Sequence, residues 1–339
     1  MSTQQDPSIG KPSREDAAAR PRRRHRPALP TRNGVSASCV ALPHGPWPTV
    51  LAFLAHRIPA VSHDDWAARM ARGEVMDHEG QPLAPDAAYR PQTKVYYWRS
   101  LPFEHPIPFE EGVVFQDEWL VIADKPHFLP VTPKGRYLQE TLLVRLKRRL
   151  GLDTLVPMHR IDRETAGLVA FTIQPATRDA YQALFRDKRV RKSYEAIAPL
   201  NPALRFPLTH RSRLEESERF MAMHEVAGPP NAETEVTLLE TADGWGRFLL
   251  QPITGQKHQL RAHMAALGMP LVNDQIYPEL MPAQPAHEPP DVSRPLQLLA
   301  RSLAFEDPVT GQARHFDCGR SLDLHAALRA FKASAPPRR

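Results

Sequence analysis

The chain has 339 residues, of which 42% are hydrophobic, and its formal net charge is +6. This length allows one large domain beside a smaller one, whereas no apolar run approaches the ~20 residues that a membrane-spanning helix needs. The N-terminus lacks the apolar segment of a signal peptide. Cys39 and Cys318 lie far apart and form no metal-binding pattern. We therefore expect a cytoplasmic protein with no metal ion, no cofactor and no membrane partner.

Residues 1–44 are polar, rich in proline and basic, and they show no hydrophobic periodicity. Residues 1–33 hold eight lysine and arginine residues against three acidic ones, whereas the rest of the chain holds 36 against 35. This composition predicts a disordered basic tail. Its candidate phosphate contacts are Arg22, Arg23 and Arg24. The alternative is a solvated tail with no role of its own.

Residues 45–100 are predicted to form a small module. An apolar helix begins at Thr49, and a second, N-capped helix spans residues 62–72. Strand signals follow at residues 73–75 and 94–98. Two helices followed by strands resemble the α-L RNA-binding module. Its phosphate contacts would be Arg57, Arg69 and Arg72, for which the alternative is an ordinary solvated helix face.

Residues 107–318 are predicted to form the main domain, in which strand signals dominate. The predicted strands span residues 113–115, 120–123, 168–173, 193–198, 233–239, 247–252, 260–263 and 297–305. Two helices interrupt them, at residues 138–150 and 177–185. Many strands with few helices predict an α+β fold with a mainly antiparallel sheet. We expect residues 319–339 to form a C-terminal helix or tail.

The stretch from residue 159 to residue 168 reads His-Arg-Ile-Asp-Arg-Glu-Thr-Ala-Gly-Leu. It places Asp162 between Arg160 and Arg163, so the acid is expected to stay ionised. An isolated aspartate of this kind usually belongs to a turn or a surface ion pair. Further blocks stand in a fixed order around it, however. They are residues 113–126, which end in Lys125-Pro126; residues 191–197, Arg-Lys-Ser-Tyr-Glu-Ala-Ile; residues 254–263, Thr-Gly-Gln-Lys-His-Gln-Leu-Arg-Ala-His; and residues 271–277, Leu-Val-Asn-Asp-Gln-Ile-Tyr.

Together these blocks resemble the RluA-type RNA pseudouridine synthases over roughly residues 107–318. The resemblance implies a bent mixed sheet with the active cleft across its middle. It also implies that Asp162 is the catalytic carboxylate, that Tyr194 stacks on the target base and that Arg261 pairs with Asp162. The chain departs from the family pattern at Ala166, Gln256 and Ala300. These departures leave the three site residues intact and bear on the choice of substrate.

The implied reaction breaks the bond between uracil N1 and ribose C1′, turns the base, and joins C5 to C1′. It needs no redox or phosphoryl step, and the sequence has no dinucleotide or P-loop pattern. Asp162 could attack the sugar or act as a base, and the sequence does not choose between them. The implied partner is ribosomal or transfer RNA, bound by a monomer. The candidate RNA contacts outside the tail are Arg160, Lys125, Lys192 and His258.

Three alternatives follow from the same residues. His159, His258 and His263 could bind a metal, but no acid or cysteine joins them at ligand spacing in the sequence, so no metal site is predicted. A non-catalytic RNA-binding or ribosome-assembly factor on the same fold would not need the three site residues. A glycosidase or nucleosidase typically uses two carboxylates, and we expect Glu164 to point away from Asp162.

Overall fold

The structure is a computed structural model that describes residues 27, 29–218, 222–282, 284–285 and 287–334. Arg22, Arg23 and Arg24 therefore lie outside the described residues. The chain divides into two compact units, one containing Ala37–Trp98 and the other containing Pro30–Ser36 with the chain from Arg99 onward. No helix in the described part of the chain combines the length and apolar character that crossing a bilayer requires.

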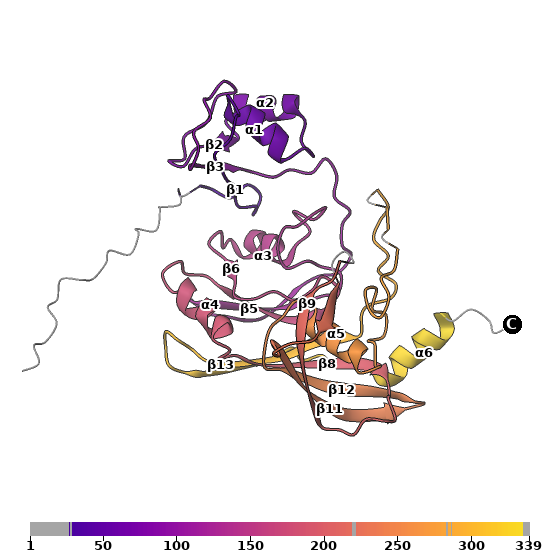
Figure 1. The fold of residues 1–339 in the computed structure, drawn as a ribbon. Helices are drawn as coiled ribbons and strands as arrows, with labels where there is room; N and C mark the ends of the chain where they lie inside the picture. The colour runs from indigo at the N-terminus through magenta and orange to yellow at the C-terminus, as the bar shows by residue number, and fades with distance from the viewer. Residues whose placement is uncertain (1–26, 28, 219–221, 283, 286, 335–339) are drawn as a thin grey trace, which may run out of the picture. The chain divides into compact units, whose positions relative to one another are not determined.

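The first unit combines two short helices with a three-stranded sheet of order β1-β3-β2 (Figure 1). Its elements are β1 (Ser38–Ala41), α1 (Val50–Arg57), α2 (His63–Ala71), β2 (Val75–Met76) and β3 (Lys94–Tyr97). The side chains of Thr49 and Ser62 cap the two helices, as their positions in the sequence predict. Residues 38–41, which the sequence analysis assigned to the tail, form β1 instead, because antiparallel pairing with β3 satisfies their backbone groups.

The second unit contains a sheet of eleven strands. The strands are β4 (Gly112–Gln116), β5 (Leu120–Lys125), β6 (Val156–Pro157), β7 (Ala166–Thr172), β8 (Arg191–Pro199), β9 (Leu208–Glu216), β10 (Met223–Val226), β11 (Ala232–Ala242), β12 (Trp245–Pro252), β13 (Leu298–Glu306) and β14 (Ala313–Asp317). The main path runs β10-β9-β11-β12-β8-β13-β7-β5-β4, with β14 beside β13 and β6 beside β7. Neighbouring strands of this sheet run antiparallel, except β13 and β7, which are parallel. The predicted α+β fold with a mixed, mainly antiparallel sheet is confirmed.

Four helices accompany this sheet in the described residues: α3 (Leu142–Leu150), α4 (Arg178–Arg186), α5 (Gln259–Ala266) and α6 (Leu324–Ser334). Alternate residues of β5 point to opposite faces. Leu120 and Ile122 pack in the cluster that contains residues of α4, whereas Val121 and Ala123 pack in the cluster that contains residues of α3. These two strand faces therefore build two separate cores, and they fix the strands that precede and follow the loop of residues 159–165.

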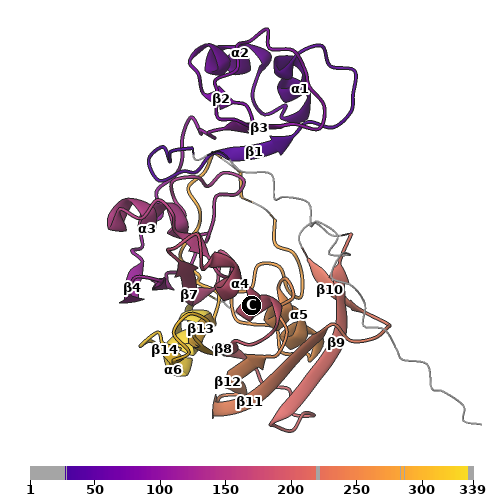
Figure 2. The same ribbon diagram turned by 90° about the vertical axis from the view of Figure 1, so that its left-hand side faces the viewer.

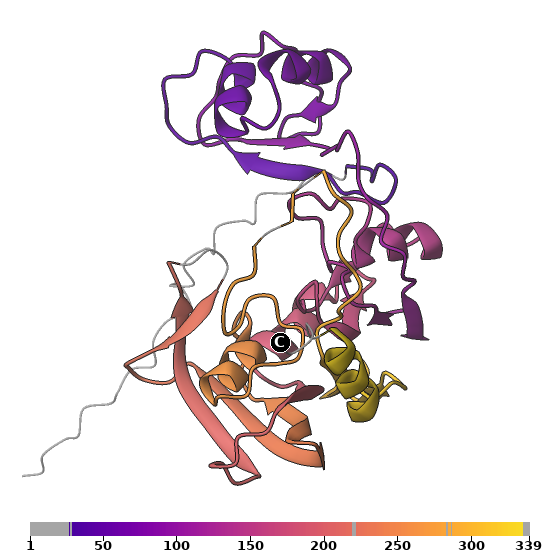
Figure 3. The same ribbon diagram turned by 90° about the vertical axis from the view of Figure 1, so that its right-hand side faces the viewer.

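Helix α5 corrects the sequence analysis, which predicted a strand at residues 260–263. Every residue from Gln259 to Met264 is buried, so the segment has no polar face from which a helical period could be recognised. Leu260, Ala262 and Met264 instead alternate with polar residues, which is the pattern of a strand. Figures 2 and 3 show α5 lying inside the curve formed by β9, β11 and β12.

Candidate active site

The loop that carries Asp162 joins β6 to β7 and is held at both ends. The N–H of Ala170 donates a hydrogen bond to His159 Nε2 at 3.2 Å, and the imidazole stacks on Phe185 with ring centroids 4.4 Å apart. Burial lowers the pKa of His159 to about 3, so this ring is a neutral acceptor at pH 7. The N–H of Thr165 donates to the backbone carbonyl of Asp162 at 3.2 Å and closes a turn.

Asp162, Arg261 and Asp274 form a chain of charges, which we call the site chain. Arg261 Nη1 lies 3.0 Å from Asp162 Oδ2, while its Nε and Nη2 donate to the two oxygens of Asp274 at 2.8 and 2.7 Å. Arg261 is buried with 1% of its side chain exposed and Asp274 is fully buried, whereas Asp162 keeps 27% exposed. Burial disfavours the guanidinium charge, but Asp274 and then Asp162 outweigh it and raise the pKa of Arg261. The carboxylate of Asp162 is thus oriented by a buried arginine and accessible.

Among the described residues, neither Arg160 nor Arg163 pairs with Asp162, although both stand close to it in sequence. Arg163 donates from Nε to Glu164 Oε1 at 2.8 Å and from Nη1 to the hydroxyl of Tyr137 at 2.7 Å. Arg160 is exposed, and no hydrogen bond or ion pair joins it to another described residue. The guanidinium that holds Asp162 therefore comes from a helix about a hundred residues away in the sequence, because adjacent side chains on an extended loop diverge.

Glu164 is a second carboxylate beside the site chain, and this corrects the expectation that it points away. Its Oε2 lies 4.0 Å from Arg261 Nη1. Burial disfavours its charge, but Arg163 and Arg261 together hold the pKa of Glu164 below its usual value. Glu164 is therefore ionised at neutral pH and cannot serve as a general acid there.

His258 and Tyr277 line the other side of Asp162. His258 Nε2 lies 3.8 Å from Asp162 Oδ1, and His258 Nδ1 lies 3.3 Å from the hydroxyl of Tyr277. His258 adopts the left-handed backbone conformation, with φ of 52°, immediately before α5 begins. Burial lowers the pKa of His258, so the ring is neutral at pH 7. Its Nε2 is too far from Asp162 for a hydrogen bond, which leaves Oδ1 available to another donor.

Tyr194 lies on β8, where it pairs in register with Leu250 of β12 and Ala300 of β13. It is half-buried and packs against the apolar cluster that includes Leu260 of α5. Burial, and after it the charge of Asp162, raise the pKa of Tyr194, so the side chain is a neutral phenol. The structure thus brings together Asp162, Tyr194 and Arg261 from a loop, a strand and a helix.

Lys125 is not an RNA contact, because its side chain is fully buried. Its Nζ donates to three backbone carbonyls, those of Pro126, Leu129 and Arg163, at 3.0, 2.8 and 3.0 Å. Burial lowers the pKa of Lys125 to about 7. The lysine predicted to meet RNA instead ties the end of β5 to the loop that carries Asp162.

Lys192 and His258 were also predicted to contact RNA, and the structure encloses both in part. Lys192 is half-buried, and its Nζ donates to the carbonyl of Thr254 at 3.0 Å. Burial lowers the pKa of Lys192 to about 8. His258 is buried beside Asp162. Both residues therefore lie in or next to the site, whereas Arg160 remains an exposed candidate at its rim.

Gly167 shows why the loop sequence requires glycine. Its φ is +106°, and a Cβ atom there would lie 2.2 Å from the carbonyl oxygen of Ala300. No side chain fits in that space, so glycine lets β7 and β13 approach closely where they run parallel. This contact sets the distance between the Asp162 loop and the strands that carry Tyr194.

Two site residues, Asp274 and Tyr277, received no role in the sequence analysis, although the block that contains them was recognised. Asp274 Oδ1 also accepts from the N–H groups of Ile276 and Tyr277 at 2.8 and 3.1 Å. No pattern of neighbouring residues predicts that Asp274 is buried and paired with Arg261, because this pair forms only where α5 and residues 271–277 meet in space.

Comparison with known proteins gives the class. The RNA pseudouridylate synthase family matches residues 119–266. The dual-specificity RNA pseudouridine synthase RluA of Salmonella typhi is 29% identical over 214 residues, covering 60% of this chain and 90% of that protein. A mitochondrial tRNA pseudouridine(32) synthase of Saccharomyces cerevisiae is 31% identical over 173 residues, covering 49% of this chain and 36% of that protein. These matches support the RluA-type pseudouridine synthases as the family that this chain resembles.

Solved structures show the same fold. Human RNA pseudouridylate synthase domain containing 1 matches with a TM-score of 0.51 at 20% identity, covering 68% of this chain and 97% of that one. Human RNA pseudouridylate synthase domain containing 4 matches with a TM-score of 0.50 at 24% identity, covering 65% of this chain and 93% of that one. At these identities the likeness concerns the architecture of the sheet and its helices.

Proposed function

We propose that the protein converts specific uridines of structured ribosomal or transfer RNA to pseudouridine, with Asp162 as the catalytic carboxylate. The observation that carries this proposal is a partly exposed Asp162 held by the buried Arg261. The named specificities of the relatives, dual-specificity RNA in one and tRNA in another, support the choice of RNA class.

Asp162 acts on the ribose of the target nucleotide or on its base. Its Oδ2 is occupied by Arg261, and its Oδ1 has no hydrogen-bond donor among the described residues. Oδ1 is therefore the atom that meets C1′ as nucleophile or takes a proton as base. In either case the N1–C1′ bond breaks, C5 joins C1′, the C5 proton leaves and N1 gains a proton. Arg261 Nη1, at 3.0 Å from Asp162 Oδ2, holds the carboxylate in place for either role.

Tyr194 supplies the face on which the released uracil rests while it turns. Its raised pKa keeps it a phenol, so it contacts the base by stacking and by its hydroxyl group. The target nucleotide must leave its stack, which costs a few kcal/mol. The exposed Arg160, two residues before Asp162, is placed to contact the backbone of the displaced nucleotide.

The first unit is proposed to bind RNA outside the site, as an α-L-like module. Arg57 is exposed at the end of α1, and Arg72 at the end of α2 pairs with Glu74 through Nε at 3.1 Å. Arg69 lies over the ring of Trp66, 5.4 Å from its centroid. Arg57 is therefore the freest of the three arginines to contact a phosphate.

A non-catalytic RNA-binding factor and a glycosidase are less well supported. A binding factor would not need a buried arginine fixed on two sides to orient a carboxylate. A glycosidase needs one carboxylic acid with a raised pKa beside the carboxylate. Glu164 lies 4.0 Å from Arg261, beyond Asp162 and Asp274, and its pKa is lowered, which is the wrong direction for that role.

The test compares Asp162→Asn with Asp117→Asn. Asp117 is a matched control, because its Oδ2 also lies 3.0 Å from an arginine, Arg314, and 24% of its side chain is exposed. Tritium release from C5-labelled uridine in total RNA would measure turnover. We expect Asp162→Asn to lose activity by about 10³-fold or more, and Asp117→Asn to stay within about threefold of wild type. Activity of Asp162→Asn within tenfold of wild type would remove Asp162 from the reaction.

A further inference from the structure

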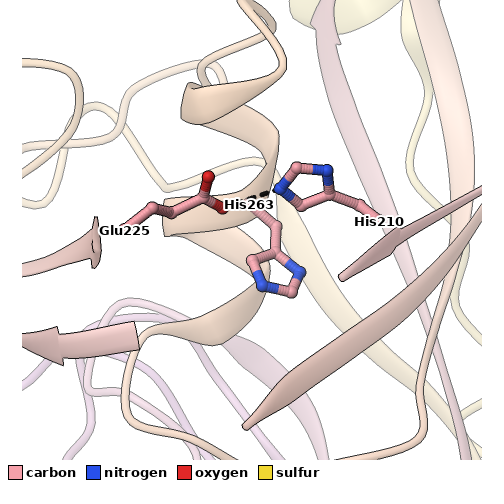
Figure 4. A group of neighbouring side chains, drawn as sticks. All are labelled: His210, Glu225 and His263. Carbon is pink, nitrogen blue, oxygen red and sulfur yellow. Dashed lines mark hydrogen bonds and ion pairs between the residues drawn. The ribbon is translucent and has the colours of Figure 1, made fainter. Parts of the chain in front are cut away.

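One group of side chains away from the uridine site has the composition of a metal centre. His210 of β9, Glu225 of β10 and His263 of α5 each offer one ligand atom, and these atoms all lie within 4.8 Å of one another. Figure 4 shows the three side chains converging from two strands and a helix. No acid stands at ligand spacing from His263 in the sequence, and it is tertiary packing that brings Glu225 near it.

The geometry of this group suits a divalent transition metal. His210 Nε2 lies 2.7 Å from Glu225 Oε1, and the rings of His210 and His263 have centroids 4.8 Å apart at 82° to each other. Two imidazoles and one carboxylate are ligands that zinc accepts, with water in a fourth position. His263 is fully buried, whereas His210 is half-buried and Glu225 is exposed, so an ion can enter from their side.

The surroundings of His263 provide the outer contacts that metal-bound histidines usually have. Its Nδ1 lies 2.9 Å from Thr234 Oγ1, and its Nε2 lies 3.1 Å from Ser212 Oγ. Whichever nitrogen turns to the ion, a hydroxyl group accepts from the other and fixes the ring.

We propose that His210, Glu225 and His263 bind one divalent transition-metal ion of the zinc class, which fastens β9 and β10 to α5. His263 follows Arg261 by two residues, which turns it about 200° around the helix. Arg261 contacts Asp162 and Asp274, whereas His263 contacts Ser212 and Thr234. The ion would thus stabilise the helix that carries Arg261 without touching the uridine.

The competing explanation is an ordinary ion pair between His210 and Glu225 beside a hydroxyl-bonded His263. The two explanations are separated by titrating chelator-treated full-length protein with Zn²⁺ and measuring the heat of binding by calorimetry. We expect one equivalent of Zn²⁺ to bind, and Co²⁺ in its place to give visible absorption typical of tetrahedral coordination. His210→Ala and Glu225→Gln should each weaken Zn²⁺ binding by more than the ~10–100-fold that loss of an outer contact causes.

His224→Ala is the matched control, because His224 is the exposed neighbour of Glu225 on β10 and points to the opposite face of that strand. It should bind Zn²⁺ like the wild type. Zn²⁺ should also raise the melting temperature of the wild type and of His224→Ala, but not of Glu225→Gln. The proposal would be overturned if the wild type did not bind Zn²⁺, or if His210→Ala and Glu225→Gln bound it as tightly as the wild type does. No RNA enters the titration, so that result would leave the proposed reaction untouched.

Discussion

A second aspartate–arginine–aspartate chain lies in the same unit as the site chain. Arg314 of β14 donates from Nη2 to Asp117 Oδ2 at 3.0 Å and from Nε to the fully buried Asp307 at 3.1 Å. We call it the β14 chain. In both the site chain and the β14 chain the outer aspartate is about one-quarter exposed, at 27% for Asp162 and 24% for Asp117. Charge pairing and exposure alone therefore do not distinguish the site.

The two chains differ at the second oxygen of the outer aspartate. Asp117 Oδ1 accepts from the N–H groups of Trp119 and Leu120, both at 2.8 Å, and so completes the turn between β4 and β5. Within the part of the chain that the structure describes, Asp162 Oδ1 accepts no hydrogen bond, and the neutral His258 lies 3.8 Å away. A carboxylate whose acceptors are filled by its own backbone is structural, whereas one with an open oxygen can meet a substrate.

The largest effect is expected when each arginine is removed. Arg261→Met and Arg314→Met should both cost about 3–5 kcal/mol of stability, because each leaves a buried aspartate unpaired. In single-turnover assays below the melting temperature, Arg261→Met should lose at least about 100-fold in rate, equal to ~2.7 kcal/mol. Arg314→Met should stay near wild type. Denaturant unfolding and tritium release measure the two quantities separately.

A double variant keeps this comparison interpretable if Arg261→Met folds poorly. Arg261→Met with Asp274→Leu removes both buried partners and should recover much of the lost stability. It should not recover activity, because nothing then orients Asp162. If the folded double variant turned over RNA at the wild-type rate, Arg261 would serve the fold alone.

The tyrosines beside the two chains give the next largest effect. Tyr194→Leu should lose base stacking, about 1–3 kcal/mol in transition-state binding, whereas Tyr194→Phe keeps the ring and should retain most of it. Tyr181 donates to Asp307 at 2.8 Å in the β14 chain. Tyr181→Phe should therefore lower stability by about 1 kcal/mol and leave the rate unchanged. Wild-type binding and turnover in Tyr194→Leu would make Tyr194 a packing residue.

The smallest effect on the chemical step is expected from the basic N-terminal segment, which lies largely outside the described residues. Removing residues 1–33 takes away eight lysine and arginine residues. RNA affinity should fall and its salt dependence should flatten, because fewer counterions are released on binding. The single-turnover rate at saturating RNA should not change. An unaltered slope of log affinity against log salt would mean that this segment does not contact RNA.

The sequence alone was sufficient for the class of fold, the family and the choice of Asp162, Tyr194 and Arg261 as site candidates. These conclusions depend on local signals. Thr49 and Ser62 mark helix starts because capping acts over three residues, and β5 and β7 are recognisable from continuous apolar runs. The polar strand β9 and the short β10 lack such a signal and were not predicted.

Only the tertiary structure decided which polar groups are buried and which partner each one has. Lys125 looks like an RNA contact in sequence, but its ammonium group is buried and donates to two carbonyls of the segment that follows it and to that of the distant Arg163. Asp162 has two arginines beside it in sequence and takes a third one from α5. Helix α5 is buried on every side, so its period is hidden. Burial and pairing depend on segments that are distant in sequence and adjacent in space. The free energy of a buried charge depends on whether such a segment supplies an opposite charge or a hydrogen-bond partner.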